Sequence, residues 1–251
     1  MNNMKIRKVS ILSTIITVLF AMLIFNANSQ QPSDSKKGNW VWLFEEESTD
    51  AWRDLKSMQF PEQGWIVKDG VLTVLGKNGN VPYGQDIITK VQYSNFELEL
   101  EFQLTKGANS GIKYFVRDDF PGQEGKYLGL ECQLIDDKRH ADAKLGKNGN
   151  RTLTSLYDLI PPSKNKKVSP PGKWNKAKIF VDGSHVEHWL NGKKVLEFNR
   201  HSDSFRELVS ESKYNKLQKF GESSQGHILL QGHGDEVSFR LIRIRTWEIT
   251  L

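Results

Sequence analysis

The residues of this chain best suited to moving protons or binding hydroxyl groups lie in short stretches where polar and apolar side chains alternate. In GLECQLIDDKRH (129–140), alternation with period two indicates a half-buried strand that ends in a charged loop. Glu131 and Gln133 fall on one face of that strand, and Cys132 falls on the other. A carboxylate beside an amide can form one wall of a binding cleft, where it can act as a general acid or base. The alternative is a solvated face followed by a polar loop.

Other predicted strands also carry polar and aromatic side chains on a single face. These sets are Lys113, Phe115 and Arg117; Glu187 and Trp189; and His227, Gln231 and His233. Their opposite faces look like core, which favours a wet cleft over a randomly polar surface. Aromatic faces cover the C–H patches of a sugar ring, while amides and carboxylates bind its hydroxyls, so the pattern suits a carbohydrate.

Metal binding is a second chemistry that these residue types could supply. His227 and His233 would lie about 20 Å apart along a regular strand, so they cannot ligate one ion. His140 with Asp136 or Asp137 could bind a divalent cation through oxygen ligands. We favour a polar loop there and predict no cofactor and no metal.

Two residues with reactive side chains fall on apolar faces. Cys132 is the only cysteine, so no internal disulfide can form, and its position predicts a small buried hydrophobe. His188 has the parity of Val186 and Leu190, which leaves a core histidine and a site role equally open.

The N-terminus has the three parts of an export signal. Lys5, Arg7 and Lys8 precede an apolar run at 10–25, and small residues at 27–29 suit a signal peptidase. We therefore predict a signal peptide at 1–29 and an exported protein, periplasmic or extracellular, with no stable membrane span after processing. A retained membrane anchor is the alternative. Removal of this segment lowers the formal charge from +5 to about +2, and no basic stripe indicates a nucleic acid partner.

The rest of the chain reads as one all-β domain at 38–251. NFELELEFQL (95–104) alternates without a break, and similar strands recur to the C-terminus. In the last strand a change of parity predicts either a bulge near Leu241 or burial of both faces. Asp69-Gly70 and Asn191-Gly192 predict tight hairpins. The pattern at 202–221 predicts one helix, capped by Asp203 or Ser204. About eleven strands favour a two-sheet antiparallel jelly-roll sandwich with one short helix.

Six blocks in fixed order make a family resemblance specific. They are ANSGIKYFVRD (108–118), GLECQLIDDKRH (129–140), LYDLIPPSK (156–164), GKWNKAKI (172–179), HVEHWLNG (185–192) and GHILLQGHGDEVSFRLIRIR (226–245). Together they resemble the DUF1080 family, the 3-keto-disaccharide hydrolase domain, from about Trp40 to Trp247. The resemblance implies a concanavalin A-like lectin/glucanase sandwich. One position departs from the family pattern: Gly232 stands where the last block usually carries a carboxylate.

The resemblance implies an exported hydrolase that cleaves glycosidic bonds of 3-keto-glycosides or related disaccharides. Its chemistry would be elimination through an enolate, followed by addition of water. We expect Glu131, His233 and His140 to be the catalytic acid–base groups. We expect the substrate to be held by Asn109, Lys113, Arg117, Gln133, Tyr157, Glu187 and Gln231. A sugar 3-oxidoreductase acting upstream would be a natural partner.

Two alternatives use the same fold. A two-carboxylate glucanase of the laminarinase type carries three acids on one strand, and this chain keeps only Glu131 of them in the corresponding stretch. A non-catalytic, lectin-like carbohydrate-binding module needs only the cleft. Turnover of a 3-keto-disaccharide distinguishes that module from the hydrolase.

Overall fold

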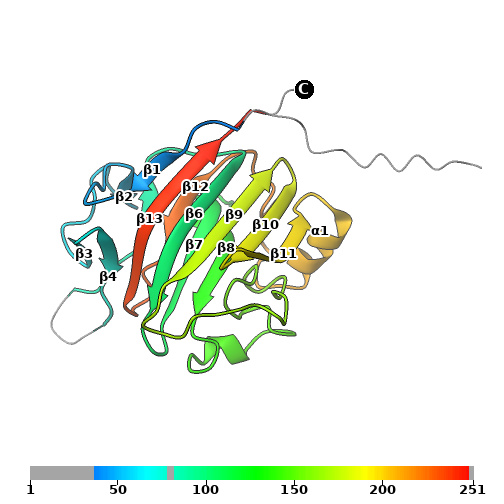
Figure 1. Cartoon of the computed structure of the whole chain (residues 1–251). Helices are drawn as coiled ribbons and strands as arrows, with labels where there is room; N and C mark the ends of the chain where they lie inside the picture. Colours follow the sequence, from blue (N-terminus) through cyan, green and yellow to red (C-terminus); the bar gives the residue numbers. More distant parts are fainter. Residues whose placement is uncertain (1–36, 78–81, 249–251) are drawn as a thin grey trace, which may run out of the picture. The chain divides into compact units, whose positions relative to one another are not determined.

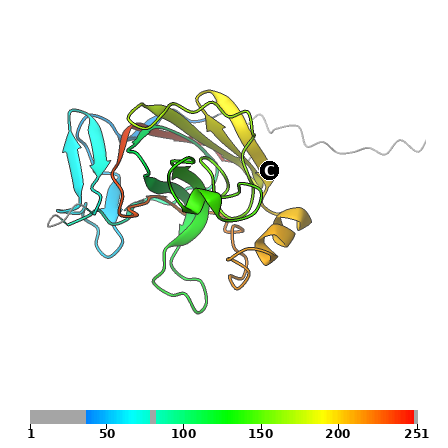
Figure 2. The ribbon, with the colours of Figure 1, turned by 90° about the horizontal axis from the view of Figure 1, so that it is seen from below.

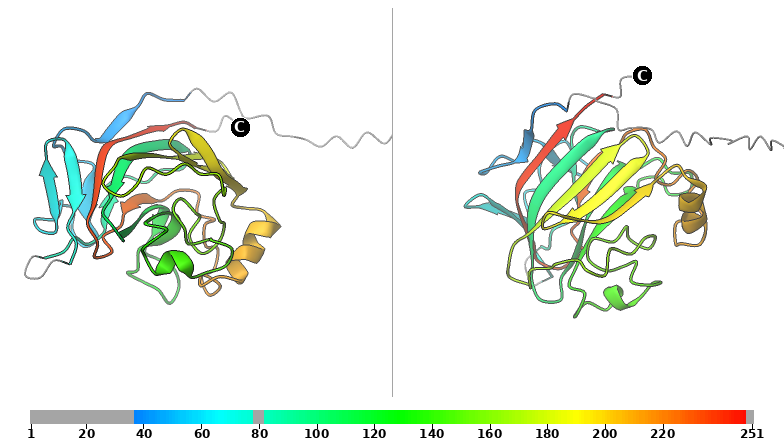
Figure 3. Two further views of the ribbon diagram at one scale, coloured as in Figure 1. Left: turned by 60° about the horizontal axis from the view of Figure 1, so that its bottom comes forward. Right: turned by 45° about the vertical axis from the view of Figure 1, so that its right-hand side comes forward.

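Two antiparallel sheets form the domain in a computed structural model that describes residues 37–77 and 82–248 (Figure 1). The large sheet has the order β11-β10-β9-β6-β13-β4-β3, with β1 also paired to β13, and the small sheet has the order β2-β5-β12-β7-β8. Figure 3 shows the two sheets stacked on each other. The strands of the large sheet are β1 (Val41–Phe44), β3 (Trp65–Lys68), β4 (Val71–Val74), β6 (Phe96–Leu104), β9 (Asn175–Asp182), β10 (His185–Leu190), β11 (Lys193–Asn199) and β13 (Val237–Thr246). Those of the small sheet are β2 (Trp52–Asp54), β5 (Ile87–Thr89), β7 (Asn109–Arg117), β8 (Leu128–Ile135) and β12 (His227–Leu230).

The alternation of β6 separates the core from the solvent as the sequence predicted. Phe96, Leu98, Leu100 and Phe102 are buried in the single large core between the sheets. The alternate positions carry glutamates on the outer face, where each meets an arginine of β13. The pairs are Glu97 with Arg245, Glu99 with Arg243, and Glu101 with Arg240. This two-sheet all-β architecture confirms the predicted sandwich.

The predicted bulge and hairpins are present. On β13 the register to β6 shifts between Arg240 and Arg243, and Leu241 lies between them with φ 51°. This extra residue reverses the parity of the strand, so that both halves of β13 bury apolar side chains. Asn191 and Gly192 both have positive φ in the β10–β11 turn, as a two-residue hairpin of this type requires.

The helix is shorter than the sequence predicted. α1 spans Asp203–Ser210, and its N-cap is Ser202, one residue before the expected caps; the Ser202 hydroxyl accepts from the Phe205 N–H at 3.2 Å. Phe205 is buried and packs the helix against the core. Residues 211–221 continue as turns, which bring polar side chains to the small sheet. A second short helix, the 3-10 turn η1 (Asp142–Lys144), lies in the loop after β8.

His188 is a core residue that joins the two sheets. Its Nε2 lies 2.9 Å from the hydroxyl of Tyr114 on the small sheet, and its Nδ1 lies 3.2 Å from the carbonyl oxygen of Thr154. Complete burial lowers the pKa of His188 to about 4, so the ring is neutral at physiological pH. The histidine left open by sequence is therefore structural.

No helix among the described residues is long and apolar enough to cross a bilayer. The predicted signal peptide, 1–29, lies outside the residues that the structure describes.

Candidate active site

Glu131 lies in the middle of β8, on the face of the small sheet that points away from the core. Its neighbours Leu130 and Cys132 point inward, as expected from the alternation. The residue is only 6% exposed, yet no hydrogen bond from any described residue reaches its carboxylate. A methyl group on Gly111 of the adjacent strand would lie 2.3 Å from Glu131 Oε1, so the missing side chain at Gly111 makes room for the carboxylate.

The charges around Glu131 suit a group that exchanges protons. Lys113 is its cross-strand partner, and Lys213 approaches from the turns after α1. Burial raises the pKa of the Glu131 carboxyl, the two lysines oppose that rise, and the nearby Asp86 carboxylate adds to it. The Nζ of Lys113 lies 3.9 Å from Oδ2 of Asp86. A carboxyl group with a raised pKa is a stronger base than an exposed one, as proton abstraction from carbon requires.

A pocket of about 310 Å³ opens over Glu131. One wall is the small sheet, another is the segment after α1, and the tip of the β7–β8 loop contributes Gln123. Figure 2 shows this loop and the segment after α1 extending on the same side of the small sheet. The lining residues are Lys113, Gln123, Leu128, Gly129, Glu131, Lys213, Tyr214, Lys216, Leu217 and Gln231. The pocket is therefore rich in lysine and contains one buried carboxylate.

A carboxylate from another segment, Asp86, lies beside the position where the last sequence block lacks one. The N–H of Gly232 donates to Oδ1 of Asp86, just before β5, at 2.9 Å. A side chain at Gly232 would meet the carbonyl oxygen of Gly84 at 2.3 Å, so glycine fits this packing and a larger residue does not. Burial raises the pKa of Asp86, and Lys113 lowers it. Asp86 therefore lies beside Gly232, the position at which the last sequence block departs from the family pattern.

The structure distinguishes between the two histidines predicted as partners of Glu131. His233 is exposed and lies near enough to Glu131 and Asp86 to influence the pKa of both carboxyls. His140 lies elsewhere: its Nδ1 accepts from the Asp142 N–H at 3.1 Å, and its Nε2 is 4.0 Å from Asp235 Oδ2. His233 is therefore the better placed of the two.

Besides Lys113, four predicted substrate-binding residues lie on or beside this face. Gln231 lines the pocket, and its N–H donates to the carbonyl oxygen of Gly111 at 3.0 Å. The hydroxyl of Tyr157 donates to Asp142 at 2.9 Å, and its ring lies 4.0 Å beneath Lys213 Nζ. Gln133 is 1% exposed, and its side-chain oxygen accepts from the Leu134 N–H.

The fourth of these residues, Asn109, is the first residue of β7 and lies near His140. Its N–H donates to Asp235 Oδ2 at 3.0 Å, and its buried side-chain oxygen has no partner among the described residues. Asn109 and Gln133 therefore have little exposure to a ligand.

Arg117 and Glu187 require correction, because the structure does not bring them to Glu131. Phe115 has φ 51°, and the pairing of β7 with β8 shifts between Tyr114 and Arg117. The bulge turns Phe115 into the core and sends Arg117 to a separate polar pocket, where it pairs with Asp119. Glu187 lies on the large sheet, bonded to Lys194 and Trp189.

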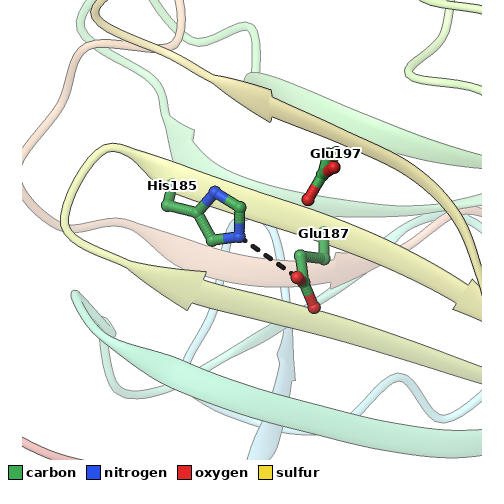
Figure 4. Close-up of side chains that lie close together, drawn as sticks. All are labelled: His185, Glu187 and Glu197. Carbon is green, nitrogen blue, oxygen red and sulfur yellow. Dashed lines mark hydrogen bonds and ion pairs between the residues drawn. The ribbon is translucent and has the colours of Figure 1, made fainter. Parts of the chain in front are cut away.

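The residues considered for a metal do not converge. Asp136 is bonded to Arg139 and to the Gly107 N–H, while Asp137 pairs with Lys166 at 2.7 Å. Within the described ranges, the one group of possible ligands is His185, Glu187 and Glu197 on β10 and β11 (Figure 4). Lys194 already pairs with both glutamates of this group, at 3.1 Å and 2.6 Å, and occupies the position of a cation.

Sequence reasoning missed Asp86, Lys213 and Gly111. An isolated glycine within an alternating strand signals close approach of another group, so Gly111 could have been found. Asp86 comes from a segment without a periodic pattern, and Lys213 falls in a stretch that was predicted as helix but folds as turns, so only the tertiary structure places them beside Glu131.

Comparison with known proteins agrees with this geometry. Residues 39–245 match the family described as the 3-keto-alpha-glucoside-1,2-lyase-like domain. A 3-keto-disaccharide hydrolase of Bacteroides thetaiotaomicron is 34% identical over 238 residues, which cover 86% of this chain and 80% of the relative. A crystal structure of a proposed glycosyl hydrolase from Parabacteroides distasonis superposes with a TM-score of 0.70 at 27% identity, covering 83% of this chain and 94% of that one. A Bacillus subtilis protein with a galectin-like fold, 12% identical with a TM-score of 0.51, covers 85% of this chain and 100% of its own, and shares the fold alone. The chain therefore belongs to the family of 3-keto-alpha-glucoside-1,2-lyase-like domains, the DUF1080 family that its ordered sequence blocks resemble.

Proposed function

We propose that the protein cleaves the glycosidic bond of 3-keto-glucosides, disaccharides among them, by elimination followed by addition of water. Family membership makes the chain a glycoside hydrolase-like enzyme. The observation that carries the proposal is the Glu131 carboxylate, which is buried in a pocket, has a raised pKa, and accepts no hydrogen bond from a described residue. Such a carboxylate is available to take a proton from carbon.

The reaction balances without an oxidant or reductant. A ketone at C3 acidifies the C2 hydrogen, and Glu131 removes it as a proton. The bonding electrons form a C2=C3 double bond, and the carbonyl oxygen becomes an enolate. The enolate then restores the ketone while a C1=C2 double bond forms, and the C1–O bond breaks as the leaving oxygen gains a proton. Water adds across C1 and C2, so the net result is hydrolysis.

Three other residues have roles suited to their positions. His233 is the proton donor for the leaving oxygen, since it lies near enough to Glu131 and Asp86 to influence the pKa of both carboxyls. Lys113 favours the ionised form of Glu131 and so opposes the effect of burial on its pKa. Gln231, which lines the pocket, binds a sugar hydroxyl.

We also propose that the protein is exported and works downstream of an enzyme that oxidises sugars at C3. The export proposal rests on the basic and apolar segments of the N-terminus. Mass spectrometry of secreted protein should find a mature terminus near Gln30, whereas an intact Met1 in the membrane fraction would contradict cleavage. The need for an upstream oxidoreductase follows from the substrate, since an ordinary glycoside lacks the C3 ketone.

The decisive experiment follows the C2 hydrogen. A 3-keto-disaccharide is incubated with the protein in heavy water, and early products are examined by NMR for free sugar and for deuterium at C2. Free 3-keto-glucose, incubated with the protein for the same time, corrects for exchange after release. Elimination places deuterium at C2 of the released keto sugar, while direct displacement at C1 leaves hydrogen there. Binding without any release of sugar would favour the lectin-like module instead.

A further inference from the structure

The pocket wall opposite Glu131 carries a lysine that the sequence did not single out. Lys213 lies in the turns after α1, and its own N–H donates to Asp158 Oδ2 at 3.1 Å. Its Nζ lies 4.0 Å from the ring centre of Tyr157 and 5.1 Å from that of Tyr214. The Tyr214 ring in turn stacks on Phe220 with centroids 4.0 Å apart. The ammonium group is thus held on an aromatic platform that is anchored to the core.

The ammonium group of Lys213 is available to a ligand. Among residues 37–77 and 82–248, no carboxylate lies within ion-pair distance of it, whereas Lys113 is close to Asp86 and Lys166 pairs with Asp137. Much of the Lys213 residue is exposed along the pocket mouth. Burial of its charged end nevertheless lowers its pKa, and Glu131 is the strongest influence in the opposite direction. Its three N–H donors therefore lack a fixed acceptor.

The charge balance of the pocket points to a negatively charged intermediate. The lining contains three lysines, Lys113, Lys213 and Lys216, and one carboxylate, Glu131. When Glu131 accepts a proton from the substrate it becomes neutral, and at that moment negative charge develops on the substrate oxygen. A preorganised cation is most effective when it faces the position where charge develops during the reaction.

We propose that Lys213 is a catalytic residue that donates a hydrogen bond to the C3 oxygen of the substrate and stabilises the enolate. This inference rests on the proposed function. Lys213 keeps its own proton throughout: Glu131 takes the C2 proton, the electron pair moves to the C3 oxygen, and the ammonium of Lys213 balances the new charge. The C3 oxygen is bonded to the carbon next to C2, which Glu131 deprotonates. A sugar ring between the two pocket walls can therefore contact Glu131 and Lys213 at once.

The test compares Lys213→Met and Lys213→Arg with Lys216→Met, a lysine of the same segment that lines the same pocket. The control is Lys193→Met, an exposed lysine of β11 that does not line it. The substrate is a 3-keto-disaccharide, and sugar release and deuterium entry at C2 are measured together. Lys213→Met should lower kcat by about 10²–10³-fold with little change in KM, because the interaction forms in the transition state. Deuterium entry should fall to the same extent. Lys213→Arg should recover much of the rate, and Lys216→Met should cost clearly less than Lys213→Met. Lys193→Met should stay within about threefold of the wild type, as expected for an outer charge.

Each other outcome overturns the inference in a recognisable way. Full turnover by Lys213→Met, with unchanged thermal unfolding, removes Lys213 from the reaction. An equal loss in Lys216→Met makes the effect one of general positive charge. A covalent adduct between Lys213 and the ketone, trapped by borohydride and located by mass spectrometry, replaces the hydrogen bond with an imine. A wild-type protein that does not cleave the 3-keto-disaccharide refutes the proposed function itself, and the role of Lys213 with it.

Discussion

Replacement of Gly111 by alanine tests whether the position of the Glu131 carboxylate matters to catalysis. The added methyl group would lie 2.3 Å from Glu131 Oε1, 3.0 Å from its Cδ and 3.1 Å from its Cγ. Ordinary contacts begin near 3.4 Å, so the carboxylate has to withdraw by about 1 Å. A displacement of that size costs about 10²-fold in rate when it moves a reacting group. We therefore expect kcat/KM to fall about 10²-fold, equivalent to about 2.7 kcal/mol of transition-state stabilisation.

The fold should tolerate this substitution. The φ angle of Gly111 lies outside the left-handed region, and the new methyl group points toward the pocket and away from the core. Thermal unfolding should therefore shift by only a few degrees, as for ordinary substitutions outside the core. The assay is release of free sugar from a 3-keto-disaccharide, followed beside a melting curve.

A double-mutant cycle provides the control. Glu131→Asp shortens the side chain by one methylene group and so draws the carboxylate oxygen back from the new methyl group. Gly111→Ala should therefore cost much less activity in that background than in the wild type. An equal loss in both backgrounds would show that the methyl group acts elsewhere. Wild-type turnover in the Gly111→Ala single variant would refute the reasoning outright.

Three further predictions follow from other parts of the structure. Glu131→Gln should lower turnover by about 10²-fold or more and should also stabilise the fold near pH 7, because the raised pKa of Glu131 means that the folded state disfavours its ionised form. This gain in stability should vanish below the ordinary carboxyl pKa of 4.5, which denaturant titrations near pH 7 and below pH 4.5 will show. The wild type should lose about 3 kcal/mol of stability as pH falls from 6.5 to 4, because only the unfolded state binds a proton to His188 in that range, and His188→Gln should remove this loss. Free energies of unfolding, measured with urea, that fall equally with pH in both proteins would contradict it. Arg117→Ala and Glu187→Gln should leave kcat/KM unchanged, since neither side chain lies in the Glu131 pocket, and a tenfold loss in either would extend the site.

The fold was predictable where a local pattern carries the information. The alternation of β6, the turn at Asn191-Gly192 and the bulge near Leu241 all follow from period, turn chemistry and parity. The bulge at Phe115 does not, because Tyr114, Phe115 and Val116 form an apolar run that does not fix which face each side chain takes. A side chain on Gly226 would lie 2.4 Å from the backbone of Phe115, so it is a close approach between distant segments that accompanies the bulge.

The candidate site was likewise predictable from the sequence only in part. Glu131, Lys113 and Gln231 lie on strands whose polar faces could be recognised, and the structure brings them to one pocket. Asp86 lies just before a short strand, and Lys213 lies in turns where the sequence had predicted a continuing helix, so neither direction could be predicted. Arg117 was misplaced because the bulge reverses the face of every residue that follows it.

The β7–β8 loop has a consequence for how relatives of this protein can diverge. Its turns are closed by hydrogen bonds among residues 118–126, and a side chain added at Gly122 or Gly125 would meet nothing within 4 Å. The loop therefore tolerates insertions and deletions that the sheets do not. Gln123 at its tip lines the pocket, while Glu131 and Lys113 lie on the strands below. In the mechanism proposed above, a longer or shorter loop would change the size of the leaving group that the pocket accepts, and the strands that carry Glu131 and Lys113 would stay unchanged.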